Sequence, residues 1–342
     1  MLERTLSSPH LPVRPKVSNV MRDVLLALLP GIAIYTAFFG IGVPVNLVLC
    51  ALACWGFEAL FLKLRSRPLW PFLSDGTALV TGALLALALP PYAPWWVAVL
   101  AAGFAMSLGK HLYGGLGYNP FNPAMVGYIV MLISFPEAMT RWPDPQPLWT
   151  DSAGLGQQLA AIGGARVDAL VGATPLDHIR TQLLLNNTLG EIQEHRVFGL
   201  LAGQGWEWIS LGWLLGGLWL IRRGHISWRI PAGLLGALAL MAAVFWLIDA
   251  DRYASPLFHL LSGGAILGAF FIATDPVSAS TTPLGRILFG AGIGLLTYVI
   301  RAWGGYPDAI AFAVLLMNIG VPLLDQYTKP RVYGQKQREE SL

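Results

Sequence analysis

This chain is dominated by apolar runs of roughly 20 residues, the length at which an α-helix crosses a hydrocarbon core about 30 Å thick. The sequence has 342 residues, of which 55% are hydrophobic and 12% are charged. An ordinary soluble domain has about 25% charged residues. Together these features predict an all-α, polytopic membrane protein.

The apolar runs and the helix breakers between them predict ten transmembrane spans. A hydrophilic segment, 140–205, separates the fifth span from the sixth and is far longer than the usual connection of about 4 to 6 residues. We therefore expect it to carry a distinctive function. The predicted regions are the tail 1–22, a five-span half 23–139, the segment 140–205, a five-span half 206–327 and the tail 328–342. The predicted spans are 23–43, 45–62, 77–91, 95–109, 121–139, 206–221, 230–248, 256–273, 285–300 and 307–324.

The distribution of Lys and Arg predicts the orientation in the membrane. With ten spans both termini share a side, and this side then holds sixteen of the 22 Lys and Arg residues, against six on the other. Of these six, only Arg252 and Arg301 are placed in short connections, which are the ones that set topology. Both termini are predicted to be cytoplasmic. The segment 140–205 is predicted to be periplasmic, in the inner membrane of a bacterial cell.

Two stretches of the first half recur in the second half. "LSDGTALVTGALL" at Leu73–Leu85 is similar to "LSGGAILGAFF" at Leu261–Phe271, and "KHLYGG" at Lys110–Gly115 is similar to "RAWGG" at Arg301–Gly305. Because each half has an odd number of spans, the second half enters the membrane in the opposite direction. The pattern predicts two inverted five-helix repeats, a layout that resembles urea channels.

In such folds the functional site lies between the halves, on interrupted helices whose free backbone groups face a cavity. Three interruptions are visible, "ALPPYAP", "GLGYNPFNPAMVG" and "ATDPVSASTTPLG". Polar residues within or near such elements are candidates for an ion or electron pathway, although capping of a helix is the favoured explanation for most of them. These candidates are Asp75, Thr77, Asn119, Asn122 and Asp275.

Other polar residues within the spans leave two alternatives open. Glu58 is an intramembrane carboxylate and so a functional candidate, but it could also reach the cytoplasmic interface beside Lys63. His259 is expected to be a packed polar residue rather than a ligand. Cys50 and Cys54 are one turn apart, where a disulfide is unfavourable, so we expect simple packing and no metal site.

The hydrophilic segment contains "DALVGATPL", in which Asp168, Gly172, Ala173 and Thr174 match the pattern Asp-x-x-x-Gly-Ala-Thr. This pattern resembles the signature at which a flavin transferase attaches FMN to a threonine through a phosphoester bond. Small residues at Gly172 and Ala173 would allow close approach to the Thr174 hydroxyl, and Pro175 is expected to keep the following backbone out of a helix. The alternative is an ordinary turn that caps a helix at Leu176.

Taken with "GYNPFNPAMVG" and "ATDPVSAST", the signature makes the whole chain resemble the family of the Rnf complex D subunits and the B subunits of the sodium-pumping NADH:quinone oxidoreductase. The short N-terminal tail favours the Rnf branch. The resemblance implies a membrane protein of such a complex that carries covalent FMN on Thr174 and, by family, a second, non-covalent flavin, riboflavin.

The resemblance also implies partners. The FMN would take electrons from a flavin on a neighbouring periplasmic subunit and pass them inward, in a complex that couples electron flow between ferredoxin and NAD to the movement of Na⁺ or H⁺. A flavin transferase is implied for maturation, and the other Rnf subunits for activity. No motif indicates nucleic-acid binding or a complete enzyme. The competing class is a urea-channel-like pathway for a small solute, in which Thr174 stays unmodified.

Overall fold

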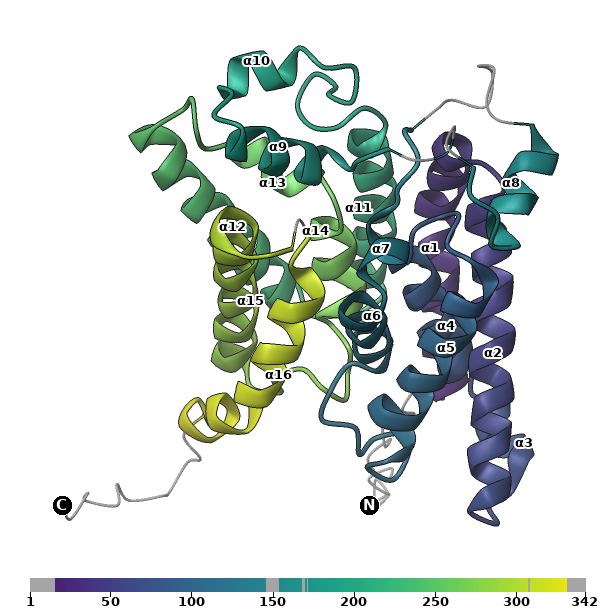
Figure 1. Cartoon of the computed structure of the whole chain (residues 1–342). Helices are drawn as coiled ribbons and strands as arrows, with labels where there is room; N and C mark the ends of the chain where they lie inside the picture. The colour runs from purple at the N-terminus through teal and green to yellow at the C-terminus, as the bar shows by residue number, and fades with distance from the viewer. Residues whose placement is uncertain (1–15, 146–153, 168–169, 171, 307, 331–342) are drawn as a thin grey trace, which may run out of the picture.

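The computed structural model describes residues 16–145, 154–167, 170, 172–306 and 308–330, and within these ranges it consists of helices and loops without a strand (Figure 1). The first half comprises α1 (Val17–Phe39), α2 (Gly42–Leu64), α3 (Leu69–Leu73), α4 (Thr77–Ala88), α5 (Trp95–Phe104), the π-helix Ala105–His111, α6 (Pro123–Ser134) and α7 (Pro136–Thr140). The hydrophilic segment contains α8 (Leu155–Ile162), α9 (Pro175–Leu184) and α10 (Leu189–Gln193). The second half comprises α11 (Trp206–Arg222), α12 (Arg229–Ile248), α13 (Pro256–Leu261), α14 (Ala265–Leu267), the π-helix Gly268–Ile272, α15 (Pro283–Trp303) and α16 (Ile310–Tyr327).

Five helices are long and apolar enough to cross a membrane: α1, α2, α12, α15 and α16. The other five predicted spans correspond to shorter or interrupted elements. The helices α4 and α6 have 12 residues each, and α11 has 17. A π-helix continues α5, and the eighth predicted span is divided into α13, α14 and a second π-helix. The prediction of a helical membrane protein is confirmed.

The two sequence repeats share a local structure. In each copy a short helix ends at the leucine of Leu-Ser, and the next helix begins four residues later, at Thr77 and at Ala265. A glycine with positive φ lies in each break, Gly76 at +80° and Gly263 at +66°. Glycine adopts this conformation without the steric cost that a Cβ would bring. Both copies therefore form an interrupted helix, at positions other than the three interruptions predicted from the sequence.

A buried cation lies against each interruption. The ammonium of Lys110 donates to Thr77 Oγ1 at 3.0 Å and to Glu58 Oε2 at 2.6 Å. The guanidinium of Arg301 donates to the carbonyl oxygen of Ser262 at 3.3 Å. The count of Lys and Arg in connections between spans also included Lys110 and Arg301, and this placement was wrong, since both are buried within helical elements. Glu58 is also buried, paired with Lys110, and does not reach out beside Lys63.

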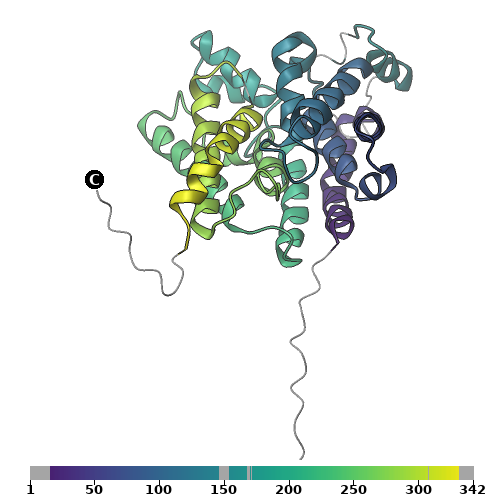
Figure 2. The same ribbon diagram turned by 90° about the horizontal axis from the view of Figure 1, so that it is seen from below.

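Helix α1 begins and helix α16 ends at the same face of the molecule. The helices α8, α9 and α10 cover the opposite face (Figure 1). Viewed from below, the helices of the first half gather on one side and most of those of the second half on the other (Figure 2). The halves meet where α1 crosses α11. A Cβ on Gly212 would lie 2.8 Å from the Cα of Gly31, so only glycine permits this close crossing.

The hydrophilic segment is anchored to both halves. Gln158 of α8 accepts the backbone N–H of Ile41 at 3.3 Å, at the start of α2. On the other side, α9 and α10 form a small apolar cluster with α13 that includes Leu176, Ile192 and Phe258. The segment therefore covers the junction of the halves and holds α9 above it.

Candidate functional site

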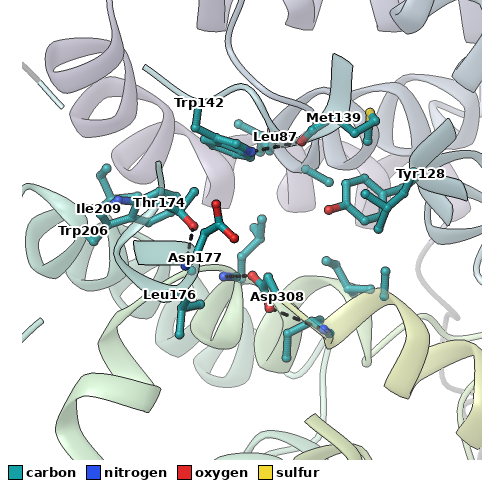
Figure 3. Close-up of a pocket in the computed structure, with 18 of the residues that line it drawn as sticks. Leu87, Tyr128, Met139, Trp142, Thr174, Leu176, Asp177, Trp206, Ile209 and Asp308 are labelled. Carbon is teal, nitrogen blue, oxygen red and sulfur yellow. Dashed lines mark hydrogen bonds between the residues drawn. The ribbon is translucent and has the colours of Figure 1, made fainter. Parts of the chain in front are cut away.

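Thr174 lines a cavity at the junction of the two halves (Figure 3). The cavity and the open space at its mouth together measure about 1040 Å³. Elements of both halves and of the hydrophilic segment form its walls. The aromatic residues among them are Tyr35, Tyr128, Trp142, Trp206 and Trp213.

Four of these rings, those of Tyr35, Trp142, Trp206 and Trp213, pack into one wall. The ring centroids of Trp142 and Trp206 are 5.8 Å apart, and those of Tyr35 and Trp206 are 6.4 Å apart. Tyr128 lies across the cavity, with its hydroxyl directed toward Thr174 and Asp177 (Figure 3). Large rings with a polar edge suit a flat, partly polar aromatic ligand.

Thr174 is the N-cap of α9. Its Oγ1 accepts the backbone N–H of Asp177 at 3.2 Å, and its carbonyl oxygen accepts the N–H of His178 at 2.8 Å. Pro175 is the first helical residue, where its missing N–H costs no hydrogen bond. The expectation that Pro175 keeps the following backbone out of a helix was therefore wrong. Thr174 does cap a helix, which begins at Pro175, and this capping by itself does not test whether the hydroxyl carries FMN.

A second structural role explains the glycine of the signature. The backbone N–H of Gly172 donates to the carbonyl oxygen of Trp142 at 2.6 Å, forming an isolated bridge. A Cβ at this position would overlap the carboxylate of Asp144. Ala173, partly buried, joins this bridge to Thr174. Asp168 lies outside the described residues.

Two carboxylates line the cavity with Thr174. Burial raises the pKa of Asp177 above its ordinary value, a shift that Arg180 and then His178 partly offset. Asp308 accepts the N–H of Gly264 at 2.6 Å and a hydrogen bond from Arg301 Nη2 at 3.1 Å. Asp308 thereby holds the break between α13 and α14 against the loop that precedes α16.

The residues present fit FMN esterified to Thr174. The hydroxyl is at the N-terminus of a ten-residue helix, where free backbone N–H groups and the helix dipole favour a phosphate. The aromatic wall offers packing for the isoalloxazine ring. The flavin would supply the redox chemistry, and the chain would hold and orient it.

A second cavity, of about 910 Å³ including its opening, contains four of the five candidate pathway residues. Thr77, Asn119, Asn122 and Asp275 line it, together with Lys110 and His225. Asp75 is not among its lining residues; it accepts the N–H and the hydroxyl of Thr77, at 2.7 and 2.6 Å. Asp75 thus supports the start of α4, in the capping role that the sequence left open.

Asn122 joins the two halves at this second cavity. Its Oδ1 caps α6 by accepting the N–H of Met125 at 3.3 Å, its Nδ2 donates to the carbonyl oxygen of Ile272 at 3.1 Å, and its N–H donates to Asn318 Oδ1 at 3.2 Å. Asn119 donates only locally, to the carbonyl oxygen of Phe121. Capping and bridging are therefore combined in Asn122.

Asp275 closes a turn instead of capping a helix. Its carboxylate accepts the N–H of Val277 at 3.2 Å and the hydroxyl of Ser278 at 2.9 Å. The N-cap of α15 is Thr282, whose hydroxyl accepts the N–H of Gly285 at 3.0 Å. The expectation of a helix cap at Asp275 was wrong because the next long helix begins only after Thr282.

The two cavities lie back to back without sharing any described lining residue. Met125 lines the first and its neighbour Ala124 lines the second. In the same way, Ile272 lines the first and Phe271 the second. Neighbouring residues of α6 and of the second π-helix thus line different cavities.

No group of three or more His, Cys, Asp or Glu residues that could hold a metal ion occurs in the described part of the chain. Cys50 and Cys54 are free and buried, in agreement with simple packing. His259 is also buried, and its carbonyl oxygen accepts Arg301 Nη1 at 2.7 Å.

The sequence reasoning missed Tyr128, Trp142 and Asp308 as cavity residues. Trp142 follows the fifth predicted span directly, and interfacial tryptophans are common there, so nothing in its position pointed to a cavity. Lys110 and Arg301 were more accessible to prediction, because a cation beside an apolar run and aligned with a repeat is unusual.

Comparison with known proteins agrees with this architecture. The sequence model of the NQR2, RnfD, RnfE family matches residues 4–334. The chain is 52% identical to the D subunit of the ion-translocating oxidoreductase complex of Alcanivorax borkumensis, over 97% of each chain. It is 48% identical to the D subunits of the same complex from Escherichia fergusonii and Cronobacter sakazakii, over 98% of this chain and 99% and 100% of the relatives. The chain belongs to the NQR2, RnfD, RnfE family.

Proposed function

We propose that this chain is the membrane subunit of an Rnf-type ion-translocating oxidoreductase complex that carries FMN on Thr174 and relays electrons through the junction of its two halves. The observation that carries the proposal is the position of Thr174, which lines an aromatic cavity at the N-terminus of α9. The shared name of the relatives supports membership in such a complex.

The proposed relay runs from a flavin on a neighbouring periplasmic subunit to the flavin on Thr174 and then inward, coupled to the movement of Na⁺ or H⁺. The second cavity is our candidate place for a non-covalent flavin, riboflavin. In support, its walls combine polar groups at Asn122 and Asp275 with the rings of Phe270 and Phe271. Its close approach to the first cavity would favour electron transfer between them.

We further propose ten membrane crossings, five in each half, arranged as inverted repeats with both termini cytoplasmic and 140–205 periplasmic. The shared interruptions at Gly76 and Gly263 support the repeat. A cysteine at Glu194, exposed in the hydrophilic segment, should react with a membrane-impermeant thiol reagent in intact spheroplasts. One at Arg65, exposed after α2, should react only after permeabilisation; the opposite pattern would reverse the orientation.

A solute channel without a redox role is the competing function. A channel needs a continuous path, whereas the two cavities share no described lining residue. The test is mass spectrometry of the purified chain after co-expression with a flavin transferase. The peptide that contains Thr174 should gain the mass of one FMN less one water, and an unmodified peptide under these conditions would favour the channel.

A further inference from the structure

A wide groove is lined by α9, the connection between α12 and α13, α13 and the end of α15. It encloses about 1640 Å³ including its opening and does not contain Thr174. Its rim includes Arg180 of α9 and Arg252 of the α12–α13 connection, and its floor includes His259, Tyr298 and Arg301.

The groove collects positive charge on a side of the molecule that has little of it. Arg180, Arg252 and Arg301 are half of the six Lys and Arg residues that the proposed orientation places outside. Asp251 is the one acidic residue among the described residues that line the groove. Within the described part of the chain, neither Arg180 nor Arg252 forms an ion pair with a carboxylate. Arg301 is paired with Asp308, so the charge that can meet an anion is that of Arg180 and Arg252, and the rim of the groove is complementary to an anion.

The floor of the groove holds polar groups without partners. Within the described residues, three side chains that line the groove each have a buried atom without a hydrogen bond: His259 Nδ1, Tyr298 OH and Arg301 Nε. Buried polar groups are normally satisfied by protein or by ordered water, so such a concentration indicates a missing ligand or missing water.

Apolar and aromatic side chains flank the groove. Trp303, at the end of α15, is 54% exposed, and Leu184, at the end of α9, is 76% exposed. Tyr253 packs between Phe245 and Trp303, with ring centroids 5.2 and 6.5 Å away. Amphipathic aromatic rings at the ends of membrane helices are typical of the headgroup level of a bilayer.

We propose that this groove binds an anionic phospholipid of the outer leaflet. The headgroup phosphate accepts hydrogen bonds from Arg252 and Arg180 at the rim, and water held beneath it satisfies the polar groups of the floor. The acyl chains lie against Leu184 and Trp303. Basic pockets between membrane helices bind lipid headgroups in this way, and the adjoining apolar surface favours a lipid over a free ion.

The proposal can be tested by native mass spectrometry of the full chain in detergent, titrated with phosphatidylglycerol or with phosphatidylcholine of the same acyl chains. One phosphatidylglycerol should bind at least about fivefold more tightly than phosphatidylcholine. Arg252→Gln should weaken phosphatidylglycerol binding about fivefold, whereas Arg252→Lys should largely restore it. Arg166→Gln, which removes an exposed outer arginine away from the groove, is the matched control and should leave binding unchanged.

Three outcomes would overturn the proposal. Equal binding of the two lipids would remove the role of the anionic headgroup. Unchanged phosphatidylglycerol binding in Arg252→Gln, with a monodisperse elution profile, would place the lipid elsewhere. Displacement of the lipid by millimolar inorganic phosphate would make the groove a site for the free anion.

Discussion

The side-chain oxygen of Thr174 accepts the backbone N–H of Asp177 at 3.2 Å, so one hydroxyl serves as the N-cap of α9 and is the proposed acceptor for FMN. An ester oxygen is a weaker acceptor than a hydroxyl, but the added phosphate brings anionic oxygens to the same helix N-terminus. Modification should therefore preserve or strengthen the cap. A substitution that removes the hydroxyl therefore removes both the proposed FMN acceptor and the N-cap of α9, unless the new side chain can also cap the helix.

Gly172→Ala should reduce covalent flavin several-fold, because the new Cβ overlaps the Asp144 carboxylate and displaces the segment that leads to Thr174. Overpacking of this kind costs about 1–3 kcal/mol. Fluorescence of the denatured band, normalised to protein, measures the yield. Asp144→Ala in the same chain should recover part of it. No recovery would mean that the transferase recognises Gly172 directly and that the contact between this position and Asp144 has little effect on the yield of covalent flavin.

His178 should make the hydrophilic segment sensitive to mild acid. Burial lowers the pKa of His178, and the nearby His195 lowers it further. The unfolded chain, with a pKa of about 6.5, then binds a proton that the folded chain does not, so stability falls as the pH drops below about 6.5 toward the folded pKa. Hydrogen exchange of the α9 amides, corrected for the intrinsic rate at each pH, should therefore show weaker protection at pH 5.5 than at pH 7.5.

The matched variants are His178→Gln, which should flatten this pH dependence, and His195→Gln, which should weaken it. The imidazole rings of His178 and His195 are stacked with centroids 4.4 Å apart. Burial raises the pKa of Asp177, so its effect has the opposite sign, with stability gained as the pH falls through its raised pKa toward about 3.9. An unchanged pH profile in His178→Gln would assign the sensitivity to another group.

Lys110→Met should destabilise the chain strongly. It leaves Glu58, whose side chain is 2% exposed, without its partner 2.6 Å away, and removing one member of a buried ion pair costs about 3–5 kcal/mol. His111 Nε2 lies 3.3 Å from the same oxygen, but without the geometry of a hydrogen bond. The double variant Glu58→Gln, Lys110→Met should be more stable than Lys110→Met in a thermal unfolding assay. Equal losses in both variants would show that the charge of Glu58 is not the cause.

Asp275→Asn should slow electron transfer through the assembled complex, or uncouple it from ion movement, without removing flavin from Thr174. Asn can still accept the Val277 N–H, so the turn is largely kept while the charge in the second cavity is lost. Ferredoxin-dependent NAD reduction and ion uptake in membrane vesicles are the measurements. Asp75→Asn is the control outside the cavity lining. Wild-type rates and coupling in Asp275→Asn would limit this residue to closing the turn.

The sequence predicted the helical membrane class because this depends on a local pattern, the length of the apolar runs. The breaks at Gly76 and Gly263 were not predicted, since a glycine within an apolar run is also tolerated in a continuous helix. It also singled out Asn122, whose following proline marks the start of α6. The aromatic cavity was not predictable, since Tyr128, Trp142 and Trp206 come from elements whose packing no local pattern specifies. The predicted capping role of Asp275 was wrong for a related reason. An Asp before a Pro indicates either a helix cap or a turn, and the tertiary context decides between them.

The central claim, that Thr174 carries FMN, is tested most directly by flavin fluorescence in a denaturing gel after co-expression with a flavin transferase. Thr174→Ser retains a hydroxyl and the cap and should stay fluorescent. Thr174→Asn caps α9 about as well but has no hydroxyl, and Thr174→Val lacks both, losing about 1 kcal/mol of capping. Both of these variants should give dark bands, and the Asn variant should reach the membrane at normal levels. A fluorescent Thr174→Asn band would contradict the assignment of the flavin to this residue.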